Sequence, residues 1–234
     1  MKETKVAELS EIAKTADYEK GFNARLMNFR YETIKPYFRG PHGLEIGSAD
    51  GLMTQRLLGH FEELHVVEPV AKYTENIRKL PRVVVHNCLF EDFDHQEKFD
   101  TVLMCHVLEH VDNPIELLEK ASRVVRDDGR VIITVPNADS IHRHIGLKMG
   151  LLQTLDELND TDRRIGHKRV YFFKSLRDHV EKAGLKTTKK LGFFVKFLSN
   201  AQMESMDESL VQALYEISDS FKDHCSSIGF VCRK

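Results

Sequence analysis

The composition of this 234-residue chain is that of a globular protein with one large domain. Its formal net charge of −2 argues against general binding of nucleic acid or other polyanions. No apolar run approaches the roughly 20 residues of a membrane span, and the charged N-terminus lacks the apolar core of a signal peptide. The four cysteines form no C-x-x-C pair, so we expect reduced thiols and a cytoplasmic location.

The hydrophobic pattern alternates between strands and helices over the middle of the chain. Residues 3–38 predict an amphipathic helical segment that ends near Pro36. Strands are then expected at 43–47, 63–69, 82–88, 99–108 and 129–137, and helices at 51–59, 70–79 and 113–125. Short strands rich in valine and isoleucine, separated by helices, predict a parallel sheet that is covered on both faces.

The pattern changes after Asn137. Residues 138–170 are irregular and charged, and we expect them to form an inserted cap over the active site. The elements expected beyond it are a helix at 172–183, a strand at 192–198, a helix opened by Asp207 at 206–224 and a closing strand at 226–234. No repeat or low-complexity linker divides the chain, so we predict a single domain over residues 1–234.

The stretch His42–Leu58, HGLEIGSADGLMTQRLL, joins the first strand to the next helix through a glycine turn. Ligands of open α/β sheets bind beyond the carboxyl ends of the strands, where this turn lies. Counted from Gly47, alanine and leucine occupy the second and third glycine positions of the dinucleotide fingerprint, and no P-loop lysine follows. Glu45 and Asp50 favour a cationic ligand over a pyrophosphate. S-adenosylmethionine fits, because it carries an ammonium and a sulfonium and no phosphate.

Five segments, in order, resemble the class I S-adenosylmethionine-dependent methyltransferases. LEIGSADG (44–51) resembles their first motif, E-x-G-x-x-x-G, and VVEP (66–69) ends the second strand with Glu68. Three further segments resemble the family's later motifs: CLFEDF (88–93), FDTVLMCHVLEHVDNP (99–114) and RVVRDDGRVIITVPN (123–137). The resemblance implies an α/β fold: a Rossmann-like seven-stranded sheet, mostly parallel, with its last strand antiparallel and helices on both faces.

The resemblance also implies where S-adenosyl-L-methionine binds. Glu68 would accept hydrogen bonds from the ribose hydroxyls. The loop after the third strand would pack the adenine, with Asn87, Cys88 and Glu91 as open candidates for the contact to its amino group. The expected cofactor-binding residues are Glu45, Gly47, Ser48, Ala49, Gly51, Glu68, Pro69, Leu89, Phe90 and Cys105.

The stretch HVLEH (106–110) has two interpretations. It matches H-x-x-E-H, the pattern of inverted zinc peptidases, but it directly follows a buried strand instead of lying on a helix. In the methyltransferase interpretation, it lies beside cofactor and substrate, where His106 or His110 acts as a general base or only lines the pocket. His167 is the third candidate, because this family often places a substrate-facing loop just before the corresponding helix.

The segment 141–174 is rich in basic residues and histidine. Its basic residues form either a solvated face or the surroundings of an anionic acceptor, such as a nucleotide-linked sugar. The expected substrate contacts come from Arg143, Arg164 and Arg169. No carboxylate or cysteine stands at ligand spacing from His142, His144 and His167, so we expect no metal.

The N-terminal helical cover, residues 1–40, has two expected roles. Its aromatic side chains lie at helical spacing, which predicts packing against the domain. The resemblance implies that the segment also closes over the cofactor as a lid. The side chains concerned are Tyr18, Phe22, Arg25, Phe29 and Tyr31.

The predicted function is methyl transfer from S-adenosyl-L-methionine to a small molecule, preferably to a hydroxyl. No Asn-Pro-Pro-Tyr tetrapeptide follows the fourth strand, which argues against methylation of the amino groups of bases or glutamine. The alternatives are an N-methyltransferase acting on a small-molecule amine and a protein that binds the cofactor without turnover. A nicotinamide-dependent oxidoreductase is disfavoured by the failed fingerprint and by Glu45.

Overall fold

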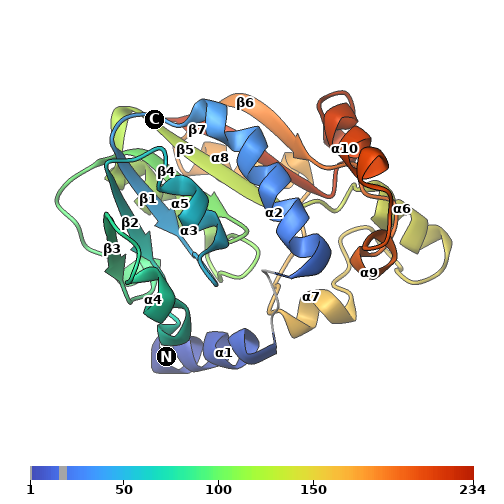
Figure 1. The fold of residues 1–234 in the computed structure, drawn as a ribbon, viewed down its shortest axis with the longest axis horizontal. Coiled ribbons are helices and arrows are strands. Elements are labelled where there is room, and N and C mark those ends of the chain that lie inside the picture. Colours follow the sequence, from blue (N-terminus) through green and yellow to red (C-terminus); the bar gives the residue numbers. More distant parts are fainter. Residues whose placement is uncertain (1, 16–19) are drawn as a thin grey trace.

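A computed structural model describes residues 2–15 and 20–234 (Figure 1). Within them a seven-stranded sheet has the order β3-β2-β1-β4-β5-β7-β6. Its strands are β1 (His42–Ile46), β2 (Glu63–Val67), β3 (Val83–His86), β4 (Phe99–Cys105), β5 (Val125–Pro136), β6 (Lys186–Phe193) and β7 (Ser227–Arg233). β7 pairs antiparallel with β5 and β6, and the other pairs are parallel. The predicted Rossmann-like sheet with an antiparallel last strand is confirmed.

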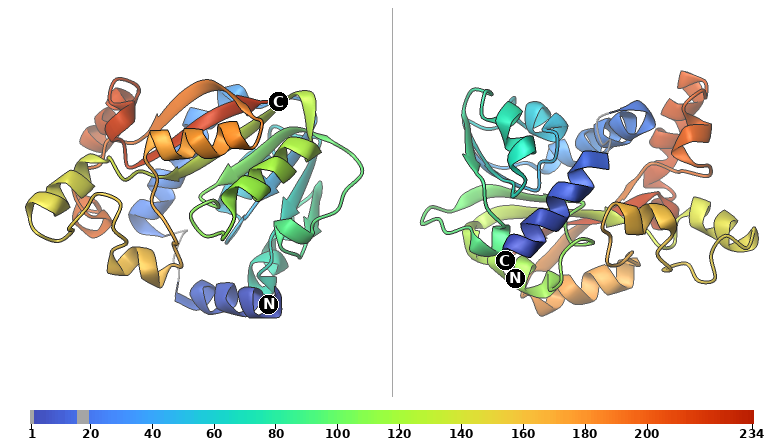
Figure 2. Two further views of the ribbon diagram at one scale, coloured as in Figure 1. Left: turned by 180° about the vertical axis from the view of Figure 1, so that it is seen from behind. Right: turned by 90° about the horizontal axis from the view of Figure 1, so that it is seen from below.

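The central strands alternate their side chains between two hydrophobic cores. On β4, Val102 and Met104 belong to one core, and Leu103 between them belongs to the other. The first core is covered by α5 (Pro114–Val124) and α8 (Phe173–Lys182), and the second by α2 (Gly21–Ile34), α3 (Leu52–Leu57) and α4 (Ala71–Ile77). Figure 2 shows α5 and α8 on the face turned away in Figure 1. Helices on both faces are therefore confirmed.

The strand expected at 192–198 is wrong in its position. β6 begins at Lys186 and pairs the polar stretch KTTKK with β7 at the edge of the sheet. An edge strand needs few apolar residues, so hydropathy alone did not reveal it. Phe194 has a φ of +63° and leaves the strand direction. Its ring then packs against Phe22 and Phe29, with centroid distances of 5.5 and 5.3 Å.

The segment after Asn137 contains more helix than expected. Within residues 138–170 lie α6 (Ile141–Lys148) and α7 (Asp160–Arg164). The long helix expected at 206–224 is shorter: α10 spans Glu208–Glu216, and two 3-10 turns follow it. Asp207 caps α10 by accepting hydrogen bonds from the backbone N–H groups of Ser209 and Leu210, as predicted. Further short elements are η1 (Lys35–Tyr37), η2 (Phe90–Asp92) and α9 (Asn200–Met203).

The N-terminal segment forms two helices, α1 (Lys2–Thr15) and α2. On α2, Phe22 and Phe29 are buried, which confirms their packing role, and Phe29 stacks on Tyr215 at 4.5 Å. The other side chains of the predicted set also have protein partners, since Arg25 pairs with Glu208 and Tyr31 with His60. Tyr18 lies outside the described residues.

All four cysteines are free thiols, as expected. In the described parts of the chain, we find no helix with the length and apolar character needed to cross a membrane.

Candidate functional site

The turn after β1 keeps the backbone of a glycine loop although it holds only two glycines. Gly47 and Gly51 have φ angles of +73° and +89°, and Ala49 between them has a φ of +46°. The left-handed conformation costs an L-residue about 1–2 kcal/mol, so Ala49 is strained. Ala49 thus stands where the fingerprint has a glycine, and the backbone of the turn keeps the same shape.

Glu68 follows β2 and folds back onto this turn. Its Oε2 accepts hydrogen bonds from the backbone N–H groups of Ser48 and Ala49, both at 3.1 Å, and its Oε1 accepts one from Val70 at 2.9 Å. Burial raises the pKa of Glu68, and these N–H donors oppose the shift. The structure thus shows Glu68 holding the cofactor turn in place. Its contact to the ribose stays a prediction.

Glu45 lies on β1, buried beneath the same turn. Its Oε2 accepts a 2.6 Å hydrogen bond from Oγ1 of Thr54 on α3. Burial raises the pKa of Glu45 to about 8, against the effect of the Thr54 hydrogen bond. The carboxyl is therefore mostly protonated at pH 7. A cationic ligand group beside it would lower the pKa again and release the proton.

The loop after β3 is tied to the end of β2. Asn87 donates its side-chain amide to the backbone carbonyls of Glu68 and Pro69, at 2.8 and 3.0 Å. Leu89 and Phe90, both expected against the adenine, are buried, and Phe90 forms part of the main core. Phe90 therefore packs in the core, and its predicted contact with the adenine would be an additional role.

The loop after β4 carries a buried imidazole–carboxylate pair. Nδ1 of His106 lies 3.0 Å from Oε1 of Glu109, and Nε2 of His106 has no hydrogen-bond partner within residues 2–15 and 20–234. Burial lowers the pKa of His106 to about 4, so the ring is neutral at pH 7. Burial alone would raise the pKa of Glu109, but His106 and the neighbouring imidazoles outweigh it, and the pKa falls to about 2.

Two further residues lie near this pair: Cys105, which the sequence predicted as a cofactor neighbour, and Arg30, which it did not. Burial raises the pKa of Cys105 to about 11, so this predicted cofactor neighbour is an unreactive thiol. Arg30, on α2, places its positive charge near Cys105 and Glu109 and was not identified from the sequence. A single arginine on an amphipathic helix gives no signal of its position in the fold.

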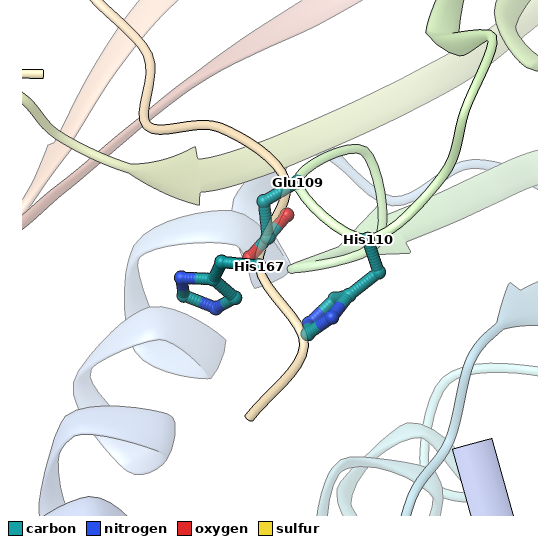
Figure 3. A group of neighbouring side chains, drawn as sticks. All are labelled: Glu109, His110 and His167. Carbon is teal, nitrogen blue, oxygen red and sulfur yellow. The ribbon is translucent and has the colours of Figure 1, made fainter. Parts of the chain in front are cut away.

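The three histidine candidates converge on Glu109. His110 comes from the loop after β4, and His167 comes from the segment after α7; their rings meet edge to face with centroids 4.8 Å apart. One ligand atom each of Glu109, His110 and His167 lies within 4.8 Å of the others (Figure 3). The sequence singled out the three histidines separately, as candidate bases, and the structure brings them together. It did not identify Glu109, the buried carboxylate between them.

Arg143, predicted to bind substrate, has a structural role in the cap instead. It is only 5% exposed, and its guanidinium donates to the backbone carbonyls of Leu155 and Glu157. It also pairs with Asp162 at 3.2 Å. Each of its three nitrogens has an acceptor and the side chain is buried, so Arg143 stabilises the cap.

Arg169 is used in a similar way. Its guanidinium donates to the backbone carbonyls of Leu108 and Val111, at 2.8 and 2.5 Å, and so fixes the loop after β4. Its predicted contact to substrate stays a prediction. Arg164, the third predicted residue, is exposed on α7, and its contact to substrate stays a prediction.

The sequence matches a known family over most of its length. The family described as "Methyltransferase domain" matches residues 16–190. The chain belongs to this family and is a class I S-adenosylmethionine-dependent methyltransferase domain, with S-adenosyl-L-methionine as its cofactor. A curated relative, an uncharacterized protein of Methanocaldococcus jannaschii, is 28% identical over 127 residues. That match covers 53% of this chain and 60% of the relative, which is less than two thirds of its length.

Solved methyltransferase structures share the fold. The N-methyltransferase NodS of Bradyrhizobium japonicum WM9, in complex with S-adenosyl-L-homocysteine, has a TM-score of 0.61 at 13% identity, over 98% of each chain. A second is the 1,6-didemethyltoxoflavin-N1-methyltransferase of Burkholderia thailandensis, with bound 1,6-didemethyltoxoflavin and S-adenosylhomocysteine. It has a TM-score of 0.60 at 16% identity, over 90% of this chain and 78% of the other. At these identities the likeness concerns the fold.

Proposed function

We propose that this domain transfers the methyl group of S-adenosyl-L-methionine to a hydroxyl oxygen of a small molecule. One observation carries the proposal: the cofactor turn and the loop after β4 lie against each other. A Cβ atom on Gly47 would come within 3.0 Å of Cγ2 of Val107, the residue next to His106. A donor bound on this turn would therefore have the imidazole–carboxylate pair of His106 and Glu109 nearby.

The reaction depends on positioning more than on activation, because the sulfonium is already a good leaving group. A lone pair of the acceptor oxygen forms the new O–CH₃ bond as the S–CH₃ bond breaks. The electron pair of the broken bond stays on sulfur, which becomes the neutral thioether of S-adenosyl-L-homocysteine. The hydroxyl proton passes to a base.

His106 is the base that the geometry favours. Glu109 orients its ring through Nδ1, and Nε2 is left free for the acceptor, as in other pairs of a base and an orienting carboxylate. His110 and His167, the other predicted bases, also have acceptors at Nδ1, so this pattern does not separate the three. His106 is favoured because it neighbours Val107, which lies against Gly47 of the cofactor turn.

The helix α1 is the part of the N-terminal cover that we propose as the lid. Its side chains Leu9 and Ala13 form a small hydrophobic cluster with Ala49 of the cofactor turn and with Val70 and Tyr73 after β2. A cofactor held on that turn would lie under α1. Closure of such a lid keeps water from the reacting sulfonium.

An amine acceptor is the second candidate. Both methyltransferases of the same fold described above are N-methyltransferases, and one was crystallised with its small-molecule substrate. An amine needs no base if it arrives uncharged. In that case, the replacement of His106 by alanine would leave the rate of transfer nearly unchanged.

The test is methyl transfer from isotopically labelled S-adenosyl-L-methionine to a panel of small molecules that carry hydroxyl or amino groups. Mass spectrometry locates the label, and His106→Ala is compared with wild type on the best acceptor. Label on oxygen with a large loss in His106→Ala supports the proposal. Label on nitrogen supports the second candidate. Tight cofactor binding without any methyl transfer would indicate a protein that only binds the cofactor. Binding of NADH in the absence of S-adenosyl-L-methionine binding would indicate an oxidoreductase.

A further inference from the structure

The carboxylate of Glu109 is buried in a way that a carboxylate tolerates poorly. Its side chain is fully buried, and within the described residues neither oxygen accepts a hydrogen bond that meets the usual geometry. Oε1 has His106 at 3.0 Å, and Oε2 has no polar partner there. Arg30 places a positive charge near Glu109 but donates no hydrogen bond to either oxygen. A buried carboxylate oxygen without a hydrogen bond is destabilising, so Oε2 still calls for a direct donor or a cation.

Two histidines present their rings to the same place, and each is held by an acceptor at Nδ1. Nδ1 of His110 lies 3.2 Å from the carbonyl oxygen of Gly166, and Nδ1 of His167 lies 3.0 Å from Oδ1 of Asp162. Both partners can only accept, so Nδ1 of each ring carries the proton. In a neutral ring Nε2 then keeps its lone pair, and it is the atom that a metal would bind. Metal-binding histidines typically have this arrangement, with the second nitrogen donating to a carbonyl or carboxylate.

The partners of His167 are themselves fixed. Asp162 takes part in the capping box of α7 with Asn159, and its Oδ2 accepts from Arg143 at 3.2 Å. The imidazole orientation is thus secured through a chain of buried polar contacts that reaches into the cap. Arg143, which the sequence suggested as a substrate ligand, is the far end of that chain.

From this cluster we infer a binding site for a divalent transition-metal ion, with Glu109, His110 and His167 as its protein ligands. Their ligand atoms lie within 4.8 Å of one another. A tetrahedral zinc site with bonds of about 2.0–2.1 Å places its ligand atoms roughly 3.3 Å apart. Side-chain rotations that draw the three groups together by about 1–1.5 Å would close the site.

The ligand set indicates the class of ion. Imidazole nitrogen suits zinc, iron, cobalt and nickel better than magnesium or calcium, which prefer oxygen. Two histidines and one glutamate form a set that leaves at least one position open for water or substrate. Glu109 and His110 are the last two residues of the H-x-x-E-H pattern, which here lies on a loop and gains its third ligand from the cap.

A second group of potential ligands, Asp139, His144 and His224, serves as a comparison. His144 and His224 are exposed, and Asp139 is already paired with both, at 2.8 and 3.6 Å. Exposed ion pairs of this kind need no metal. The buried group differs because its carboxylate oxygen lacks a partner, and so it alone carries the inference.

A metal at this site could activate the acceptor in the proposed methyl transfer; this role rests on the proposed function. Its open position would bind the hydroxyl oxygen of the acceptor and lower the pKa of that hydroxyl. The hydroxyl proton would pass to His106 or to water, and the oxygen would form the new O–CH₃ bond as the S–CH₃ bond breaks. The substrate class would be small molecules whose hydroxyl can bind a metal.

The test uses the full-length protein, freed of metal by a chelator and titrated with Co²⁺ and Zn²⁺ alone. We expect one equivalent of either ion by calorimetry and visible absorption bands from bound Co²⁺. Glu109→Gln and His167→Gln should each weaken binding at least 100-fold. Asp162→Asn, which alters only the partner of a ligand, should weaken it about 10- to 100-fold. His144→Gln, in the exposed group, is the matched control and should bind as wild type does.

Thermal unfolding and S-adenosyl-L-homocysteine affinity verify that each variant is folded. The inference is overturned if wild type binds no stoichiometric metal, or if folded Glu109→Gln and His167→Gln both bind as wild type does. Methyl transfer with and without chelator separates the two proposals. Metal binding without transfer to any acceptor would contradict the proposed function alone, and transfer that needs no metal in a protein that binds none would contradict the metal site alone.

Discussion

Ala49 donates its backbone N–H to Oε2 of Glu68 at 3.1 Å, and this contact joins the strained turn after β1 to the end of β2. The alanine keeps a left-handed conformation, and the carboxylate accepts from two consecutive N–H groups, of which Ala49 provides the second. The cofactor turn is therefore preformed by the protein, before any ligand contributes.

Replacement of Glu68 by alanine should weaken S-adenosyl-L-homocysteine binding by about 1–3 kcal/mol, the scale of hydrogen bonds to a charged group. Isothermal titration calorimetry measures the change. Glu62→Ala, at an exposed glutamate just before β2 and therefore at the other end of that strand, is the control and should keep wild-type affinity. A folded Glu68→Ala protein with unchanged affinity would remove this residue from cofactor binding.

Cofactor binding should release a proton from Glu45. Its pKa of about 8 leaves it protonated at pH 7, and a cationic ligand lowers that pKa. Affinity should therefore rise with pH up to about 8 and level off above it. Calorimetry at pH 7 in buffers of different ionisation enthalpy measures the proton count. Glu45→Gln should abolish the release, and a wild-type enthalpy that does not vary with the buffer would contradict the prediction.

Gly51→Ala should destabilise the domain by about 1–2 kcal/mol or more, because a φ of +89° disfavours any L-residue. The new Cβ would also lie 2.8 Å from Cγ1 of Ile77. Urea unfolding measures the loss. At Gly59, a Cβ would meet nothing within 4 Å and φ is not positive, so Gly59→Ala should be neutral or stabilising. Equal effects at both positions would show that the turn relaxes.

Arg169→Ala should act on stability. It removes the donors to the carbonyls of Leu108 and Val111, which should cost about 1–3 kcal/mol. The neighbouring Lys168→Ala breaks only an exposed pair with Asp112 and should cost less than about 1 kcal/mol. Denaturant unfolding compares the two. If Arg169→Ala instead raises KM for the acceptor at unchanged stability, the residue binds substrate after all.

Deletion of residues 1–15 should accelerate S-adenosyl-L-homocysteine release at least tenfold if α1 is a lid. The helix is attached to the cofactor loops by Lys5–Glu91 and by Lys72, which donates to the carbonyl of Ala13. Its hydrophobic cluster is small, so unfolding should change little. Stopped-flow displacement measures the release rate. An unchanged rate in the truncated protein would contradict the lid.

The sequence revealed the sheet, and with it the approach of the turn after β1 to the end of β2, because these signals are local. Gly47 and Glu68 each lie directly after an apolar strand, and parallel strands bring such ends together at one edge. β6 escaped detection because its lysines and threonines resemble a loop. The cap helices α6 and α7 escaped it because α6 is short and mixes histidines with few apolar residues, and α7 has no apolar residue at all.

The other half of the site depends on contacts that no local pattern reveals. The sequence has no carboxylate at ligand spacing from the cap histidines. The fold still gives two of them a carboxylate partner five positions away: Asp162 for His167 and Asp139 for His144. Glu109 was visible in H-x-x-E-H, but that pattern indicates a metal only if a helix or a distant third ligand completes it. His167, which we propose as that distant ligand, comes beside Glu109 only in the folded chain.

The hydrogen bond from His110 to Gly166 joins residues 56 positions apart, whereas Glu68 and Ser48 are only 20 apart. A longer loop costs more entropy to close, and local openings take place where contacts are few. The two halves of the site should therefore differ in local stability. In mild denaturant, the cap should undock first. The domain should then lose its affinity for the acceptor while it still binds the methyl donor.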